Sequence, residues 1–354
     1  MKKYIIILAN LFLLIGNTFS QTCLTNGITF TSQEQIDNFK INHPNCNEIE
    51  GNVTIFGSSI TNLDSLDVLE ALDGYLWINN TNIISLSGIH NIAAIKGTLS
   101  IEANSSLMDL NALQNLIIVD GFMEILDNDA LLNLSGLENL TFVGSSIWIR
   151  YNENISNLNA LSNVKSLGLG LAITDNNSLI NFEGLENITS IGFSLIVLNN
   201  ESLESFAGLE NVTLIRRAIY IENNPVLTDI TDLSNVNKIG NTIIIWNNTA
   251  LSTLEGLDNI DANSINSINI LQNPSLSYCA VQSICDYISI NAGGNFSGNA
   301  TGCNSMSEIE IICGGGIINL ESVLNINTPE VQTDDIQYES YLYENQDWEN
   351  DGIH

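Results

Sequence analysis

Apolar residues recur at fixed positions of a 24-residue unit, which occurs seven times between Gly97 and Ser264. The consensus of the unit is G-x-L-x-I-x-x-N-x-x-L-x-x-L-x-G-L-x-N-L-x-x-I-G, where x varies. Two slightly shorter copies start at Gly51 and Gly74, and a further copy starts near Asn266. A regular repeat of this length predicts a solenoid, in which each coil of chain packs on its neighbours.

The apolar positions within one unit predict short strands joined by tight turns. Positions 3 and 5 are aliphatic and flank a variable position, as in Leu99 and Ile101, which predicts one strand per coil with one buried face. Leucine or an equivalent follows at positions 11, 14, 17, 20 and 23, a spacing typical of a tightly turning chain with little helix. We therefore expect a mainly β, leucine-rich-repeat-like solenoid of about ten coils of 23–25 residues.

Asparagine recurs at two positions of the unit: at position 8 from Asn104 to Asn248, and at position 19 from Asn115 to Asn259. A side-chain amide has both donors and acceptors, so stacked copies can satisfy backbone groups at the corners of the coils. We interpret both sets as structural.

The segments outside the repeats predict an exported protein with capped ends. Residues 1–20 combine Lys2 and Lys3 with an apolar stretch and small residues before Ser20, which is typical of a signal peptide, and no later stretch is apolar enough for a transmembrane segment. Residues 21–50 form the expected N-terminal cap, where Ser32 and Gln35 have the spacing of a helix capping box. The solenoid is expected over 51–289, a C-terminal cap over 290–316 and an acidic, disordered tail over 317–354.

All six cysteines lie outside the regular repeats: Cys23, Cys46, Cys279, Cys285, Cys303 and Cys313. An even count at the two ends of an exported solenoid predicts disulfides that staple the caps. The first two pair with each other if all are oxidised, whereas the last four allow three pairings. The spacings lack a C-x-x-C pair, so we expect neither a metal site nor a cofactor.

Net charge excludes some partners. Without the leader the chain has seven basic and 40 acidic residues, a formal charge of −33. Nucleic acid and anionic membrane surfaces are therefore not expected as partners, because polyphosphate binding requires clustered Lys and Arg. The spread acidity is typical of a soluble extracellular protein.

Positions 2, 4 and 6 of each strand point away from the core, and this outer face is rich in aromatic residues. The candidate ligand-binding residues on it are Phe56, Tyr75, Trp77, Phe122, Trp148, Arg150, Tyr220 and Trp246. Exposed flat rings suit sugar faces and apolar side chains. Two alternatives stay open: the rings stabilise the sheet itself, or a homodimer or the tail covers the strand face.

Charged residues on the same face suggest an anchor and a rival function. Arg150 would hold a carboxylate of a ligand, although an ion pair with Glu124 or Glu102 is the favoured alternative for it. Glu102 and Glu124 are expected on adjacent strands about 5 Å apart, a spacing that a retaining glycosidase uses. We therefore keep a polysaccharide-active enzyme as the alternative function, although no histidine, serine elbow or phosphate loop accompanies the two acids.

The two ends of the chain resemble the caps of the receptor L-domain family, in its secreted bacterial type. The resemblance rests on residues 23–30 (CLTNGITF), 36–39 (IDNF), 44–46 (PNC) and 49–53 (IEGNV), and on 299–304 (NATGCN) near the other end. It implies a right-handed parallel β-helix over roughly residues 22–313. A likeness to leucine-rich-repeat caps, in which the bonds often cross, favours Cys279 with Cys303 and Cys285 with Cys313.

The function that the resemblance implies is recognition without catalysis. No catalytic residue is carried over, and the implied ligands are extracellular proteins or glycans. We therefore predict a secreted or cell-surface recognition or adhesion protein that is not an enzyme.

Overall fold

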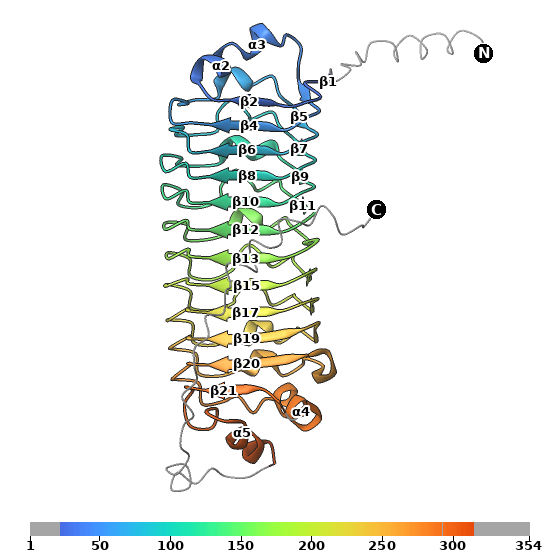
Figure 1. The fold of residues 1–354 in the computed structure, drawn as a ribbon, viewed down its shortest axis with the longest axis vertical. Coiled ribbons are helices and arrows are strands. Elements are labelled where there is room, and N and C mark those ends of the chain that lie inside the picture. Colours follow the sequence, from blue (N-terminus) through green and yellow to red (C-terminus); the bar gives the residue numbers. More distant parts are fainter. Residues whose placement is uncertain (1–21, 292, 315–354) are drawn as a thin grey trace, which may run out of the picture. The chain divides into compact units, whose positions relative to one another are not determined.

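The computed structural model describes residues 22–291 and 293–314, which lie within one compact unit. The predicted signal peptide and acidic tail are outside the described residues. Figure 1 shows one strand after another stacked along the body, and each strand of the wide sheet is hydrogen-bonded to the next. The described part of the chain is thus a solenoid-like, mainly β fold, as predicted.

The wide sheet has twelve parallel strands in chain order within the described residues. They are β2 (Ile28–Phe30), β4 (Val53–Phe56), β6 (Leu76–Asn79), β8 (Leu99–Glu102), β10 (Met123–Leu126), β12 (Ile147–Arg150), β13 (Leu171–Thr174), β15 (Leu195–Leu198), β17 (Ile219–Glu222), β19 (Thr242–Trp246), β20 (Ser267–Leu271) and β21 (Asn295–Ser297). Equivalent positions of successive units pair directly, as in Met123 with Ile147 and Ile147 with Leu171.

A second row of two-residue strands forms another wall of the solenoid. Its strands are β1 (Thr22–Cys23), β3 (Glu48–Ile49), β5 (Ala71–Leu72), β7 (Ala94–Ile95), β9 (Ile118–Val119), β11 (Phe142–Val143), β14 (Ser190–Ile191), β16 (Leu214–Ile215) and β18 (Lys238–Ile239). Leu167 bridges Val143 and Ile191, so the row is continuous from β1 to β18. We call this row the narrow sheet.

Short helical turns complete the coils. They are the 3₁₀ segments η1 (Asp64–Leu66), η2 (Asn111–Asn115), η3 (Asn159–Leu161), η4 (Thr231–Leu233), η5 (Glu255–Leu257) and η6 (Ala262–Ser264). The α-helices α2 (Gln33–Asp37), α3 (Phe39–Asn42), α4 (Gln282–Asn291) and α5 (Met306–Cys313) lie at the two ends (Figure 1). At α2 the Gln35 side chain accepts the Ser32 backbone N–H at 3.2 Å, which confirms the capping box.

The core is one continuous stack of the repeated aliphatic residues. The residues at positions 3 and 5 of the unit, which lie in the strands, are fully buried. The repeated leucines of the turning segments are fully buried too. In two successive coils Phe182 and Phe206 replace leucine, and their rings pack 5.1 Å apart. Each coil therefore buries its apolar side chains only against its neighbours, which is why the sequence repeat and the structural repeat coincide.

Both sets of asparagines are structural, as predicted. The buried set at position 8 forms a ladder: Asn152 donates from Nδ2 to the carbonyls of Ile125 (2.8 Å) and Arg150 (2.9 Å), and its Oδ1 accepts the backbone N–H of Asn128 (3.0 Å). The set at position 19 is exposed and donates to the preceding coil, as Asn163 does to the Glu138 carbonyl at 2.6 Å. The amides thus satisfy backbone groups that the turns leave unpaired.

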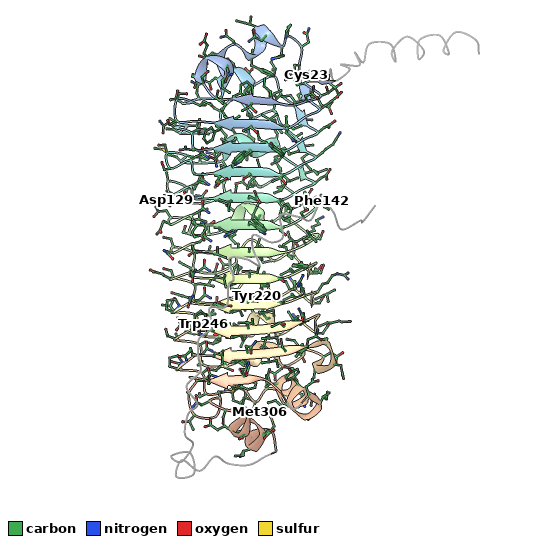
Figure 2. All side chains as sticks on the ribbon, viewed as in Figure 1. Cys23, Asp129, Phe142, Tyr220, Trp246 and Met306 are labelled. Atoms are coloured by element: carbon green, nitrogen blue, oxygen red, sulfur yellow. A yellow bond between two sulfur atoms is a disulfide. The ribbon has the colours of Figure 1, made fainter. Side chains whose placement is uncertain are left out.

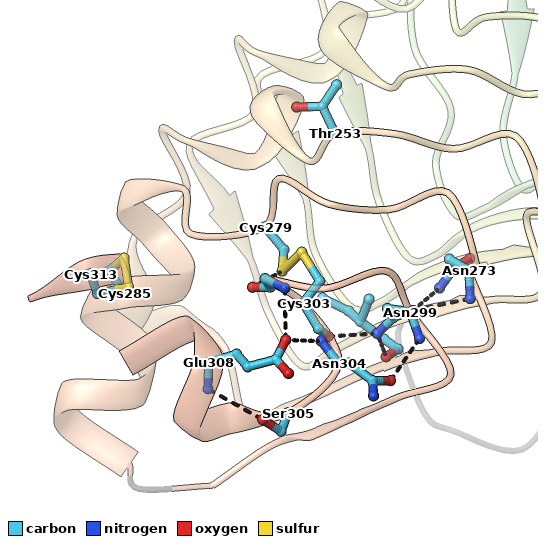
Figure 3. The surroundings of a disulfide bond; sticks show 12 residues. Thr253, Asn273, Cys279, Cys285, Asn299, Cys303, Asn304, Ser305, Glu308 and Cys313 are labelled. Carbon is cyan, nitrogen blue, oxygen red and sulfur yellow. Dashed lines mark hydrogen bonds between the residues drawn. A yellow bond between two sulfur atoms is a disulfide. The ribbon is translucent and has the colours of Figure 1, made fainter. Parts of the chain in front are cut away.

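Three disulfides join the six cysteines: Cys23 with Cys46, Cys279 with Cys303 and Cys285 with Cys313. The two C-terminal pairings are those that the likeness to leucine-rich-repeat caps favours. Figure 3 shows how the same region ends the asparagine ladder.

The last amide of the ladder belongs to Asn299, whose Oδ1 accepts the Asn273 backbone N–H at 3.0 Å. Asn304 provides the acceptor that the asparagine of a further coil would provide, because its Oδ1 accepts the Asn299 N–H at 3.1 Å. The buried Glu308 carboxylate then accepts the N–H groups of Gly302 (2.7 Å) and Asn304 (3.1 Å). The C-terminal cap therefore closes the open end of the ladder with side-chain acceptors.

Candidate ligand-binding face

The strand pairing places the predicted residues in rows on the outer face of the wide sheet. The row at position 4 runs through Trp77, Ser100, Glu124, Trp148, Ala172, Ile196 and Tyr220. The row at position 6 runs through Phe56, Asn79, Glu102, Leu126, Arg150, Thr174, Leu198, Glu222 and Trp246. Tyr75 and Phe122 directly precede β6 and β10. All eight candidates therefore belong to one sheet, where Figure 2 labels Tyr220 and Trp246.

Side-chain contacts join only part of this set. The rings of Phe122 and Trp148 meet edge to face with 5.3 Å between centroids. The Arg150 guanidinium lies 5.6 Å from the centre of the Trp148 ring and 5.5 Å from that of Tyr151. We call Phe122, Trp148, Arg150 and Tyr151 the Trp148 cluster. It is the one place on this face where the described residues combine packed aromatic rings with a cation.

Tyr151 was not predicted from the sequence, although a signal for it exists. Position 7 of every unit has a left-handed backbone, with φ of 56° at Tyr151, and Asn or Asp occupies most of these positions. A bulky aromatic residue is unfavourable in this conformation, and such residues persist where the surroundings require them. The Tyr151 side chain is half exposed and contacts Arg150, so its unusual place supports a functional cluster.

The favoured ion pair of Arg150 with Glu124 or Glu102 is wrong. Among the described residues Arg150 forms no ion pair; it stacks on aromatic rings instead. The strand register explains this, because the direct neighbour of Arg150 on β10 is Leu126, and Glu102 lies one strand further away. Arg150 is only 8% exposed, and its Nε has no hydrogen-bond acceptor in the described part of the chain.

The remaining candidates lie apart from the Trp148 cluster. The Trp77 indole N–H donates to the Glu102 carboxylate at 3.0 Å, so this ring has a structural partner. The Tyr75 hydroxyl lies 3.4 Å from that of Thr54. Trp77 and Tyr220 are each three strands from Trp148, which corresponds to about 14 Å. A compact ligand therefore cannot contact all eight residues at once.

Small residues border the cluster on its C-terminal side. Ala172 is the direct neighbour of Trp148 in its row, and Gly170 follows Ser146 at position 2 of the next unit. These positions, together with Ser194 and Ala218 further along, are buried. The outer face is therefore not open to solvent at these positions, and the exposed surface of the cluster belongs to Tyr151 and, in part, to Phe122 and Trp148.

The two acids of the alternative function lie on the adjacent strands β8 and β10, as predicted, but they do not face each other directly. Glu124 pairs with Ser100 and Glu102 pairs with Leu126, so the two carboxylates are diagonal neighbours and not directly opposite. Burial raises the pKa of Glu124; the Ser100 hydroxyl lowers it, Glu102 raises it and Arg150 lowers it. The Glu102 carboxylate accepts a hydrogen bond from the Trp77 indole N–H. This bond engages one of the two oxygens that a nucleophilic role would need.

No group of three or more His, Cys, Asp or Glu side chains in residues 22–291 and 293–314 is placed to hold a metal ion. No helix in that part of the chain is both long and apolar enough to cross a bilayer.

The fold defines the class of protein as a solenoid-like, mainly β protein with disulfides at both ends. Residues 45–108 match the Receptor L domain family, which confirms the resemblance for this part of the chain. Receptor L domains are extracellular, non-enzymatic ligand-binding domains, and the three disulfides fit that location. No curated protein matches the chain.

Proposed function

We propose that this chain is an exported recognition protein without catalytic activity, and that the Trp148 cluster is its contact surface for an extracellular protein or glycan. The observation that carries the proposal is the Arg150 guanidinium between the rings of Trp148 and Tyr151. Aromatic residues and arginine dominate binding energy at protein interfaces. The match to a ligand-binding domain family supports the same conclusion.

The chemistry of the cluster suggests what the ligand presents. Trp148 offers a ring to a sugar face or an apolar side chain. The buried Arg150 Nε has no acceptor among the described residues, so a carboxylate or carbonyl of the ligand would complete its hydrogen bonding once the covering side chains move aside. A ligand with a flat apolar part and an adjacent acceptor therefore fits best.

The test is binding of the mature chain, residues 21–354, to arrays of glycans and extracellular proteins. For each ligand found, Trp148→Ala and Arg150→Ala should each weaken binding by at least about 1 kcal/mol, or about fivefold. Tyr278→Ala is the matched control, because Tyr278 is 48% exposed and bridges Thr253 outside the wide sheet. Equal affinity of all three variants and the wild type would refute the cluster as the contact surface.

The polysaccharide-active enzyme remains the second candidate because the pKa of Glu124 is raised on an aromatic face. The two functions differ in what happens to a bound glycan. The recognition protein leaves its chain length unchanged. Shortening of the glycan that disappears in Glu124→Gln and in Glu102→Gln would establish the enzyme instead.

A further inference from the structure

The narrow sheet has an outer surface that the proposed function does not use. The second residue of each of its strands is buried, from Ile49 in β3 to Ile239 in β18. The first residues point outward and form one row: Glu48, Ala71, Ala94, Ile118, Phe142, Ser166, Ser190, Leu214 and Lys238. This row begins with an acid, ends with a base and has an aromatic residue at its centre.

Charge is separated along this wall, although Lys96, which follows β7 in the N-terminal half, pairs with Asp73 at 2.5 Å and with Glu48 at 3.9 Å. The acids at or next to the narrow strands all lie in its N-terminal half: Glu48, Glu50, Glu70, Asp73 and Asp120. The C-terminal half has four of the seven cations of residues 22–314: Lys165, Arg216, Arg217 and Lys238. The described residues pair none of these four with a carboxylate, although Arg217 stacks on Phe193 at 4.5 Å. Such segregation is unusual in a chain with a net charge of −31.

Exposed apolar side chains lie between the two charged halves. Phe142 is 42% exposed, Ile117 46% and Ile118 36%. An apolar patch between charged regions is typical of an interaction surface. The surface therefore has a hydrophobic centre and two ends of opposite charge.

We propose that the narrow sheet binds a second copy of this chain in an antiparallel, two-fold dimer. A two-fold axis that runs along β11 in the plane of contact reverses the order of the coils but leaves the strand direction unchanged. β5 and β16 each lie three steps from β11, counting Leu167 as one step. Asp73 directly follows β5 and Arg216 directly follows β16, so the axis places Asp73 opposite the second copy's Arg216.

The same axis brings a second pair of opposite charges together. Glu48 and Lys238 begin β3 and β18, which each lie four steps from β11, so these two also oppose each other. Phe142 lies on the axis and meets its own copy. No like charges oppose each other in these pairs, which is the self-complementarity that an isologous interface requires.

The size of the surface sets the expected strength. Eight steps between β3 and β18 correspond to about 38 Å, and a contact roughly 15 Å wide buries about 600 Å² per copy, below the ~800 Å² of a standard interface. We therefore expect a micromolar dimer. Its exposed charge pairs make it weaken at high ionic strength.

Charge reversal tests the pairing with the full mature chain. The acid-reversed chain carries Glu48→Lys and Asp73→Lys, and the base-reversed chain carries Arg216→Glu and Lys238→Glu. The assay is sedimentation velocity at about 20 mM salt, where charges are only weakly screened. Each reversed chain should self-associate at least tenfold more weakly than the wild type. An equimolar mixture should regain the wild-type affinity, because both pairs of ends then become complementary.

Cross-linking tests the position of the axis. Phe142→Cys places one thiol of each copy at the axis, so mild oxidation should give a covalent dimer. Asp129→Cys is the matched control, because Asp129 is exposed on the opposite edge of the body from Phe142 (Figure 2). Circular dichroism of each variant establishes that the fold is retained.

Four results would overturn the dimer. The first two are a wild-type chain that stays monomeric at up to a few hundred micromolar, and a mixture of the two reversed chains that does not regain the wild-type affinity. The other two are cross-linking of Asp129→Cys as efficient as that of Phe142→Cys, and self-association that weakens on base reversal but not on acid reversal. The last result would show that the basic half binds another anion, such as the acidic residues 317–354 of the same chain. None of these results bears on the Trp148 cluster, so failure here leaves the proposed function intact.

Discussion

Replacing one buried asparagine of the ladder should destabilise the solenoid far more than replacing an exposed one. Asn152→Ala removes the partner of three backbone groups: the carbonyls of Ile125 and Arg150 and the N–H of Asn128. A buried polar group left without a partner costs about 1–3 kcal/mol. The Arg150 carbonyl keeps the Asp127 N–H as a donor at 3.0 Å, so the other two groups set the expected loss, at least about 2 kcal/mol in the free energy of unfolding.

Asn163→Ala is the matched control within the same coil. Its side chain donates one hydrogen bond, to the Glu138 carbonyl, and is exposed, so water replaces the lost donor. We expect a loss of less than about 1 kcal/mol, as for most surface substitutions. Both variants can be compared by urea unfolding followed by far-ultraviolet circular dichroism.

Hydrogen exchange tests the ladder at a single amide. Such a local measurement is needed because repeat proteins open coil by coil and need not unfold in two states. The Asn128 amide donates to the Asn152 side chain, so it should exchange faster in Asn152→Ala and unchanged in Asn163→Ala. Equal costs for the two variants, together with continued protection of the Asn128 amide, would refute the ladder as a stabilising element.

Three further predictions concern other parts of the fold. Burial raises the pKa of Glu124 above its unfolded value near 4.5, so folding takes up a proton there; stability from this group is present at low pH and lost as pH rises through the raised pKa. Glu124→Gln should therefore reduce the fall in melting temperature as the pH rises from about 4 to about 7, and an unchanged slope would contradict this. Gly208→Ala should cost more than Gly57→Ala in a melting experiment, because both have positive φ but an added Cβ lies 2.0 Å from a backbone oxygen at Gly208 and 3.4 Å at Gly57; equal losses would contradict the clash. Replacing Cys279 and Cys303 together with serine should lower the free energy of unfolding by about 3 kcal/mol, and a loss below about 1 kcal/mol would show that the cap does not depend on this bond.

The repeat itself made most of the fold predictable. A unit of fixed length puts identical side chains at identical places in each coil, so strand register, core rows and both asparagine sets follow from the period. The capping box at Ser32 was equally local, because it depends on spacing alone. Rows of the outer face were predictable for the same reason, as Trp77, Trp148 and Tyr220 show.

Contacts between particular side chains were not predictable from the period. Whether Arg150 reaches an acid or a ring depends on its rotamer and on which residue occupies the neighbouring strand, here Leu126. The diagonal placement of Glu102 and Glu124 likewise follows from positions 4 and 6 being two residues apart along the strand. The charge separation on the narrow sheet was likewise not predictable, because single Lys and Arg residues far apart in sequence become neighbours only when the coils stack.

The most direct test of the recognition face is hydroxyl-radical footprinting of the mature chain with the tightest ligand from the arrays. Oxidation of Trp148 and Tyr151 should fall in the complex, while oxidation of Tyr278 stays unchanged. Protection of Tyr278 or Phe142 with Trp148 still fully reactive would contradict the account, because the ligand would then bind away from the Trp148 cluster.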